Sequence, residues 1–158
     1  MGKRSTKENK NAYQLSREAA GLTREKASEL MEYISDDRID KIEREVLAPH
    51  PEEILTMAKC YKDPELCNYY CSKECPIGRK YIPEIKLKDL SQITLEMLAA
   101  LNNLNKEKER LIEITVDGQI TEEEKKDFEK IREELNEISI AVQSLTMWID
   151  NAEMQGKN

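Results

Sequence analysis

An unbroken apolar repeat near the C-terminus constrains this chain more than any other feature. Apolar residues recur there every three or four positions: Phe128, Ile131, Leu135, Ile138, Val142, Leu145, Ile149 and Ala152. This heptad register is the pattern of a long helix that packs along a second helix. The segment after residue 120 is therefore predicted to be one long amphipathic helix.

The segment before it carries a related pattern. Its apolar residues follow the same spacing of three and four, with Thr94 and Lys108 in two of the positions: Leu87, Leu90, Met97, Leu101, Leu104 and Leu111. Residues 116–119 contain a turn sequence, and Thr121 and Glu124 form a capping box that starts the second helix. A short turn forces two long helices to run antiparallel, so residues 87–154 are predicted to form a coiled-coil-like helical hairpin.

A lone pair of helices buries little apolar surface. Leu98, Ile112, Ile140 and Trp148 lie off the predicted seam of this hairpin. A second hairpin from another subunit would cover them and complete a four-helix bundle. We therefore expect a homodimer held together through residues 87–154.

Composition and charge limit the fold class and the expected location of the protein. The chain has 158 residues, of which 39% are hydrophobic and 5% aromatic, a mixture that favours an all-α fold of one or two small domains. Residues 1–80 carry 15 basic and 15 acidic side chains, whereas residues 81–158 carry 10 and 17, which accounts for the whole net charge of −7. No stretch has the ~18 uninterrupted apolar residues of a membrane span. We expect a cytoplasmic protein with no membrane partner.

The inventory of reactive side chains argues against catalysis. There is one histidine, His50, and there is no Gly-rich phosphate loop and no recognisable Ser/His/Asp or Cys/His set. We expect the protein not to be an enzyme. Since His50 lies between two prolines, we expect it to cap a helix or lie on the surface.

The N-terminal half has short apolar clusters separated by capping residues. Residues 1–10 are polar and basic and are predicted to form a disordered arm. Over residues 11–75 we predict five short helices. Gly21 ends the first, Thr23 and Ser35 cap the second and third, and prolines open the last two. A helical domain is thus expected over residues 11–76, followed by a linker over residues 77–86.

The order of these signals resembles that of a known family. The matching features lie within residues 15–59: Leu15, Gly21-Leu22-Thr23, Ala27, Ile39-x-x-Ile42-Glu43-Arg44 and Met57-Ala58-Lys59. In these features the segment resembles the lambda-repressor-like, Xre/Cro-type helix-turn-helix domain. The resemblance implies a five-helix fold and a transcriptional regulator that binds double-stranded DNA in the major groove, as a dimer on a palindrome.

The resemblance also implies roles for individual residues. Arg24 occupies the family's phosphate-contacting position, and the groove-facing positions of the third helix are Ser35, Asp36, Asp37, Arg38 and Lys41. Glu43 matches a position that typically bonds within the domain. Two features depart from the family pattern: an extra residue near Tyr33, and Glu45 where glycine or asparagine is usual.

Charge supports a second hypothesis. Residues 35–45 carry five acids and three bases, a surface that offers little neutralisation of DNA phosphates. The basic arm, through Lys3, Arg4, Lys7 and Lys10, would then supply phosphate or minor-groove contacts. The alternative is an interaction or adaptor protein whose helix-turn-helix fold and acidic hairpin dock protein partners.

All four cysteines fall within sixteen residues. They are spaced Cys60-x6-Cys67-x3-Cys71-x3-Cys75. Four thiolates from helix ends and a turn can bind Zn²⁺ or a [4Fe–4S] cluster, which would make a DNA-binding regulator metal- or redox-responsive. The alternatives are small core side chains and disulfide or redox pairs.

Overall fold

The computed structural model describes residues 9–116 and 118–156, and these ranges hold helices and no strands. The all-helical prediction is confirmed. The chain divides into two compact units, Met1–Ile85 with Asp150–Asn158, and Lys86–Ile149. Most of the predicted basic arm, residues 1–8, and Asp117 of the predicted turn lie outside the described residues.

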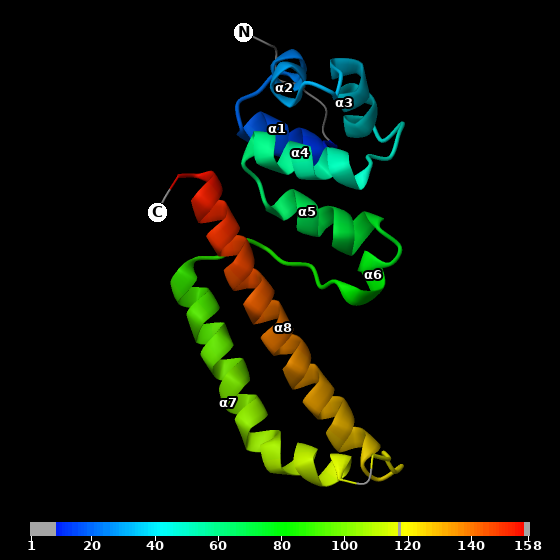
Figure 1. The fold of residues 1–158 in the computed structure, drawn as a ribbon, viewed down its shortest axis with the longest axis vertical. Helices are drawn as coiled ribbons and strands as arrows, with labels where there is room; N and C mark the ends of the chain where they lie inside the picture. The colour runs from blue at the N-terminus through cyan, green and yellow to red at the C-terminus, as the bar shows by residue number, and fades with distance from the viewer. Residues whose placement is uncertain (1–8, 117, 157–158) are drawn as a thin grey trace. The chain divides into compact units, whose positions relative to one another are not determined.

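The first unit contains a series of short helices around one core (Figure 1). Their bounds are α1 Ala12–Ala19, α2 Arg24–Met31, α3 Asp36–Glu43, α4 Pro51–Tyr61, α5 Glu65–Tyr69, the π-helical turn η1 Tyr70–Glu74 and α6 Gly78–Tyr81. Every one of α1 to α5 contributes to the buried cluster, through Tyr13, Ala27, Met31, Ile34, Ile39, Ile42, Ile54, Met57, Ala58, Tyr61 and Leu66. The core therefore fixes α2 and α3 against α1 and α4.

Side chains at the starts of α2 and α3 cap these helices, as the sequence predicts. The Thr23 hydroxyl accepts a hydrogen bond from the Lys26 amide at 3.2 Å, and the Ser35 hydroxyl accepts one from the Arg38 amide at 3.2 Å. Asn11, which the sequence reading did not single out, caps α1 in the same way through the Gln14 amide at 3.0 Å. Each cap satisfies a backbone donor that the first helical turn leaves free.

Three helices end in the same left-handed turn. Within two residues of the end of α1, α3 and α4, one residue has a positive φ: Gly21 (73°), Glu45 (59°) and Lys62 (55°). At the end of α3, the Glu45 amide donates to the Ile42 carbonyl at 3.0 Å and the Val46 amide to the Lys41 carbonyl at 2.9 Å. This is the Schellman pattern, which favours glycine. Gly21 was predicted as a helix end. Glu45 adopts the same backbone conformation although it has a Cβ, so its backbone is strained.

The segment around the cysteines differs from the predicted fifth helix and linker. α5 continues into η1, and α6 lies within the stretch expected to be a linker. Gly78 of α6 packs so closely on η1 that a Cβ there would lie 1.9 Å from the Cys71 carbonyl oxygen. Only glycine permits this approach, so α6 is packed directly on η1.

The second unit contains most of the predicted hairpin. α7 spans Leu90–Thr115 and α8 spans Lys125–Met154, and Figure 1 shows the two helices running antiparallel. Arg110 pairs with Asp127 at 2.7 Å, and Lys130 pairs with Glu107. The Glu124 carboxylate accepts a hydrogen bond from the Thr121 amide at 3.0 Å, which is one half of the predicted capping box.

One of the two predicted heptad positions on each helix lies on the buried edge, and the other lies one residue away from it. Along α7 the buried and half-buried positions include Ile93, Met97, Ala100, Leu104, Glu107, Leu111 and Ile114, and along α8 they include Ile131, Glu134, Ile138, Ala141, Leu145 and Trp148. Leu101 is 47% exposed, as is Leu135, while Val142 is 50% and Ile149 44% exposed. The apolar stripe is wider than one seam, and the small residues Ala100 and Ala141 take the buried positions. An apolar row on α8, Leu135, Val142 and Ile149, is left exposed.

No helix in residues 9–116 and 118–156 combines the length and apolar composition needed to cross a membrane.

Glu45 provides a test of the strained turn. Replacing Glu45 with glycine should raise the free energy of unfolding by about 0.5–1 kcal/mol, because glycine adopts φ near +60° without the steric cost of a Cβ. The matched control is Glu45→Ala, which removes the same charge but keeps the strain. Urea denaturation of the full chain measures both variants. Equal stability of the two would show that charge, not backbone conformation, governs this position.

Candidate nucleic-acid interface

The turn between α2 and α3 is tied to α4. It contains the extra residue noted in the sequence, and Glu32 within it has φ of 61°. The Tyr33 hydroxyl hydrogen-bonds with the Glu52 carbonyl at 3.2 Å and with the Thr56 hydroxyl. The longer turn is therefore anchored by a tyrosine that reaches across to α4.

A buried carboxylate joins the first three helices. The side chain of Glu43, at the end of α3, is 1% exposed. Arg17 of α1 binds it through two hydrogen bonds, Nε to Oε1 at 2.6 Å and Nη2 to Oε2 at 3.0 Å, and Arg24 of α2 adds Nε to Oε2 at 2.8 Å. Arg17 also donates to the Leu22 carbonyl at 2.6 Å, so it fixes the α1–α2 connection. Glu43 bonds within the domain, as the resemblance implies.

Arg24 is bound within this network by two carboxylates. Besides its bond to Glu43, its Nη1 lies 3.0 Å from Asp40 Oδ1. Its side chain is partly exposed at the start of α2, where the resemblance places a phosphate contact. Two carboxylates already neutralise its charge, so Arg24 primarily positions α2 against α3.

Arg38 is also held internally. Its Nε and Nη2 donate to Oε1 and Oε2 of Glu53, each at 2.8 Å, and Nη2 also donates to the Ala48 carbonyl at 3.0 Å. Glu53 in turn accepts from the backbone amide of His50 at 2.7 Å. His50 is the N-cap residue of α4 and is exposed, as predicted. This set of bonds ties α3 to the start of α4.

The remaining predicted residues lie on the outer surface of α3. Ser35, Asp36 and Asp37 are exposed at its N-terminal end. Lys41 pairs with Asp37 at 2.6 Å, and both side chains are well exposed, at 42% and 69%. Lys41 is therefore the one predicted basic residue that is held only by an exposed pair.

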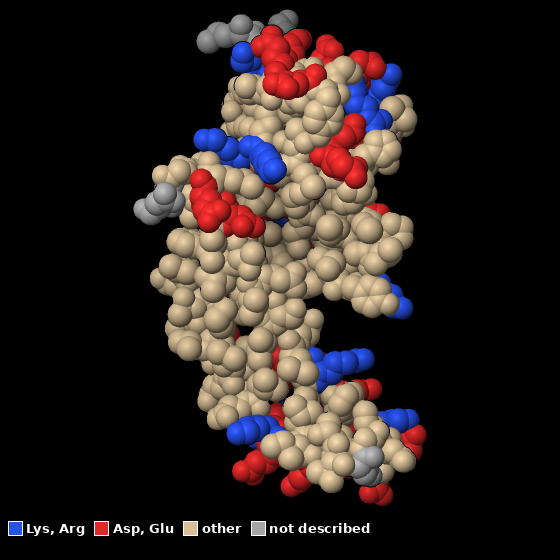
Figure 2. All heavy atoms as spheres, viewed as in Figure 1, with Lys and Arg blue, Asp and Glu red and all other residues tan. Residues whose placement is uncertain are grey.

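Arg44 was missed as a site residue. It follows α3 directly, its side chain is 61% exposed, and it forms a long ion pair with Asp40, at 3.4 Å. The sequence held one signal for Arg44: it follows Lys41 by three residues, and residues so spaced share a helix face. Figure 2 shows basic and acidic groups side by side over this part of the first unit.

The cysteines lie on successive short elements. Cys60 is in α4, Cys67 in α5, Cys71 in η1, and Cys75 directly follows η1; all four are half-buried free thiols. Burial raises the pKa of Cys60 and of Cys67, which favours the thiol over the metal-binding thiolate. Within residues 9–116 and 118–156, no group of three or more Cys, His, Asp or Glu side chains is arranged to hold a metal ion. The four thiols are not gathered here into a set of ligands, so a Zn²⁺ or [4Fe–4S] site stays a prediction from their spacing.

Comparison of the chain with protein-family models, curated proteins and solved structures gives no match. The functional argument therefore rests on the residues and on their geometry.

The Arg38–Glu53 pair predicts a dependence of stability on pH. The hydrogen bond from Arg38 holds the pKa of Glu53 below its ordinary value of 4.5. A carboxyl whose pKa is lower in the folded state stabilises the fold fully above the unfolded value and loses that contribution as pH falls through the folded value. Wild type should therefore exceed Glu53→Gln in free energy of unfolding at pH 7, and this excess should shrink below pH 4.5.

Urea denaturation between pH 3 and 7, on the order of one measurement every half unit, checks this expectation. Glu52→Gln is the matched control, since Glu52 lies in the same first turn of α4 and is exposed. An excess stability that does not change with pH would contradict the role assigned to the Arg38–Glu53 pair.

Proposed function

We propose that this protein is a sequence-specific DNA-binding transcriptional regulator that acts as a dimer on a palindromic operator. One observation carries the proposal: α3 is fixed on its inner side by Glu43 and at its flank by the Arg38–Glu53 pair, while its outer surface is exposed. In helix-turn-helix proteins the second helix of the pair enters the major groove with such a surface.

Lys41 and Arg44 are the residues proposed to contact DNA directly. Exposed ion pairs contribute only about 0–1 kcal/mol, so Lys41 and Arg44 can leave Asp37 and Asp40 for a phosphate or a base edge at small cost. Arg38 would have to leave a two-point bond to a mostly buried carboxylate. Its role in the proposal is to position α3.

A dimer places two copies of α3 on two half-sites, and the hairpin offers a surface for it. The apolar row on α8 repeats every seven residues, the period at which a helix meets a partner helix. Residues 97–105 and 138–149 contain no charged side chain. Figure 2 shows charged groups gathered at the turn end of the hairpin and uncharged atoms along much of its length. A second copy would present the same uncharged stretch, so charge repulsion would be weak around Val142.

Selection from a randomised DNA duplex library tests the DNA-binding proposal. The full chain should enrich a palindrome whose half-sites are centred one helical turn, about 34 Å, apart. Lys41→Ala and Arg44→Ala should each weaken binding of that sequence by ~1–3 kcal/mol if the side chain reaches a base edge. A phosphate contact would instead lower the salt dependence of the binding constant by about one unit of slope.

The matched control is Lys125→Ala. Lys125 lies in the hairpin and, like Lys41, is an exposed lysine paired with an acid within one helical turn, Glu122. If folded wild-type protein enriches no sequence, or if Lys125→Ala weakens binding as much as Lys41→Ala, the assignment of α3 as the DNA-reading surface is wrong.

The dimer has its own test. Val142→Glu places a charge at the centre of the apolar row, and burying an unpaired charge is costly, so the variant should be monomeric. Asn136→Glu is the control, since it adds the same charge at an exposed position on another face of α8. Light scattering with size-exclusion chromatography should give twice 18.4 kDa for wild type and the control. A monomeric wild type would refute the proposed dimer.

One observation favours a second candidate, a protein-docking module. Arg24, Arg38, Lys41 and Arg44 each lie within 3.4 Å of a carboxylate, and residues 9–85 carry 12 basic and 15 acidic side chains. A surface already neutralised in this way releases few counterions from DNA. Under this candidate, DNA binding would be absent or independent of salt, and exposed side chains around α3 would dock a protein instead.

A further inference from the structure

Two of the four cysteines lie one helical turn apart. Cys67 is in α5 and Cys71 is in η1, and the backbone is helical without a break from Glu65 to Glu74. Residues four apart on a helix face the same side, with Cβ atoms about 5–6 Å from each other. Burial raises the pKa of Cys67, and the charge of a nearby Cys71 thiolate raises it further. These two half-buried thiols are therefore neighbours on one face of the segment.

Cys75 has the same spacing from Cys71 but a different setting. It follows η1 with an extended backbone, at φ −71° and ψ 121°, so it lies beyond the end of the helix. Its sulfur atom accepts a hydrogen bond from the Gly78 amide of α6 at 3.4 Å. The helical spacing that pairs Cys67 with Cys71 therefore does not extend to Cys75.

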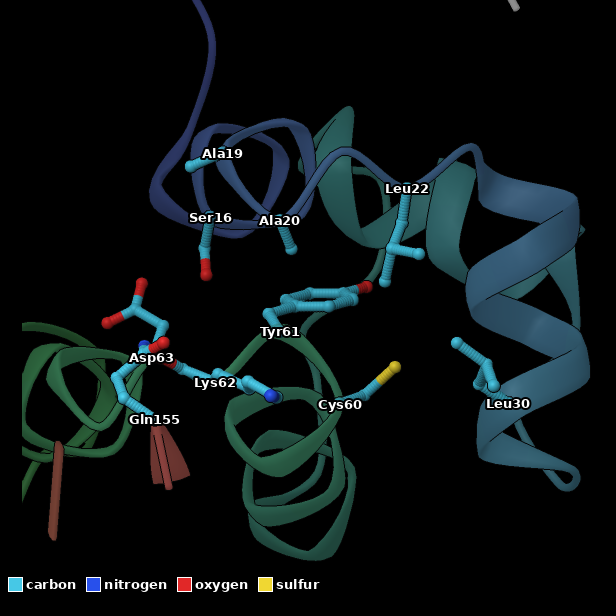
Figure 3. A pocket seen from close by; sticks show the side chains of 10 residues that line it. All are labelled: Ser16, Ala19, Ala20, Leu22, Leu30, Cys60, Tyr61, Lys62, Asp63 and Gln155. Atoms are coloured by element: carbon cyan, nitrogen blue, oxygen red, sulfur yellow. Dashed lines mark hydrogen bonds between the residues drawn. The ribbon is translucent and has the colours of Figure 1, made fainter. Parts of the chain in front are cut away.

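Cys60 lies apart from this pair. It lines a pocket between α1, α2 and α4, and in the part of the chain that the structure describes this lining includes none of the other three cysteines. Figure 3 shows the Cys60 thiol pointing toward Leu22 and Leu30. The four thiols thus divide into one helical pair and two separate side chains.

A helical pair of thiols suits a ligand that requires two sulfur atoms. A structural zinc ion takes four ligands, and cysteine binds it as the thiolate. Trivalent arsenic that carries one organic group differs, because it condenses with two thiols. Each S–H bond is replaced by an As–S bond, both hydrogen atoms leave with the arsenic-bound oxygen as water, and arsenic stays at +3. The protonated Cys67 thiol, which opposes metal binding, is a reactant in this condensation.

We propose that Cys67 and Cys71 form a dithiol site for trivalent arsenicals, in which one arsenic atom bridges the two sulfur atoms. The bridge would join α5 to η1 covalently, at the turn where Gly78 of α6 packs against the Cys71 carbonyl. This proposal goes beyond the proposed function and does not rest on it.

Phenylarsine oxide, an organic arsenical with one arsenic-bound oxygen, is a suitable probe for the reduced full chain in buffer without added thiol. One molecule should bind per chain and remove two of the four thiols from titration with dithiobis(nitrobenzoate). A competing dithiol, 2,3-dimercaptopropanol, should restore both. No loss of thiols, or loss of all four, would contradict a site of two thiols.

Alkylation with iodoacetamide followed by digestion identifies the protected thiols in wild-type protein. Trypsin cleaves after lysine and arginine, so Cys67 and Cys71 fall together in residues 63–73, whereas Cys60 and Cys75 fall in other fragments. Bound phenylarsine oxide should protect both cysteines of residues 63–73 and leave the other two alkylated. This result does not depend on the folding of any variant.

Serine substitutions test the pair directly. Cys67→Ser and Cys71→Ser should each weaken binding of phenylarsine oxide about a hundredfold or more, because the second As–S bond forms within one molecule and each variant loses that gain. Cys75→Ser is the matched control, since Cys75 has the same spacing from Cys71, and it should keep the wild-type affinity. Circular dichroism checks that each variant keeps its helices.

Protection of Cys60 or Cys75 in place of the pair, or wild-type affinity in Cys67→Ser or Cys71→Ser, would overturn the proposal. None of these results bears on selection of DNA sequences, so this proposal and the proposed function can fail separately.

Discussion

The arrangement of the first three helices depends on one buried carboxylate. Glu43 stands at the end of α3 and receives hydrogen bonds from Arg17 of α1 and Arg24 of α2. Removing one member of such a buried network leaves an uncompensated charge and typically costs about 3–5 kcal/mol. The apolar core packs α3 through Ile39 and Ile42, and this contact adds a directional constraint on its orientation, because packing alone tolerates many volume-conserving changes.

The same physics sorts the basic residues around α3 into two groups. Arg24 and Arg38 bind carboxylates with low solvent exposure, where water screens the attraction poorly. Lys41 pairs with the exposed Asp37, and the side chain of Arg44 is itself 61% exposed, so water and salt weaken both bonds. The first group is therefore structural, and only the second is free to exchange partners. Sequence position relative to a family pattern did not make this distinction, since it names Arg38 and Lys41 alike.

Helix caps and helix ends were predictable from the sequence, whereas contacts between distant segments were not. Thr23 and Ser35 as helix caps, and Gly21 as a helix end, follow from short-range backbone chemistry that the sequence displays directly. The π-helical turn and α6 escaped prediction because they depend on the close approach of Gly78 to Cys71, a contact between segments. For the same reason the spacing of the four cysteines indicated a common site, whereas the described residues hold no set of ligands arranged for a metal ion.

The hairpin shows how a correct heptad pattern can place only every second contact correctly. A heptad repeat identifies an apolar stripe. It does not identify which edge of the stripe meets the neighbouring helix, because adjacent residues lie about 100° apart around the helix and a wide stripe contains both. Here the buried edge contains Ala100 and Ala141, and the larger Leu101 and Val142 beside them are exposed. An apolar stripe wider than one interface has no structural use in an isolated hairpin. The proposed dimer would give it one, because α8 would then pack against a neighbour in its own chain and against a second copy.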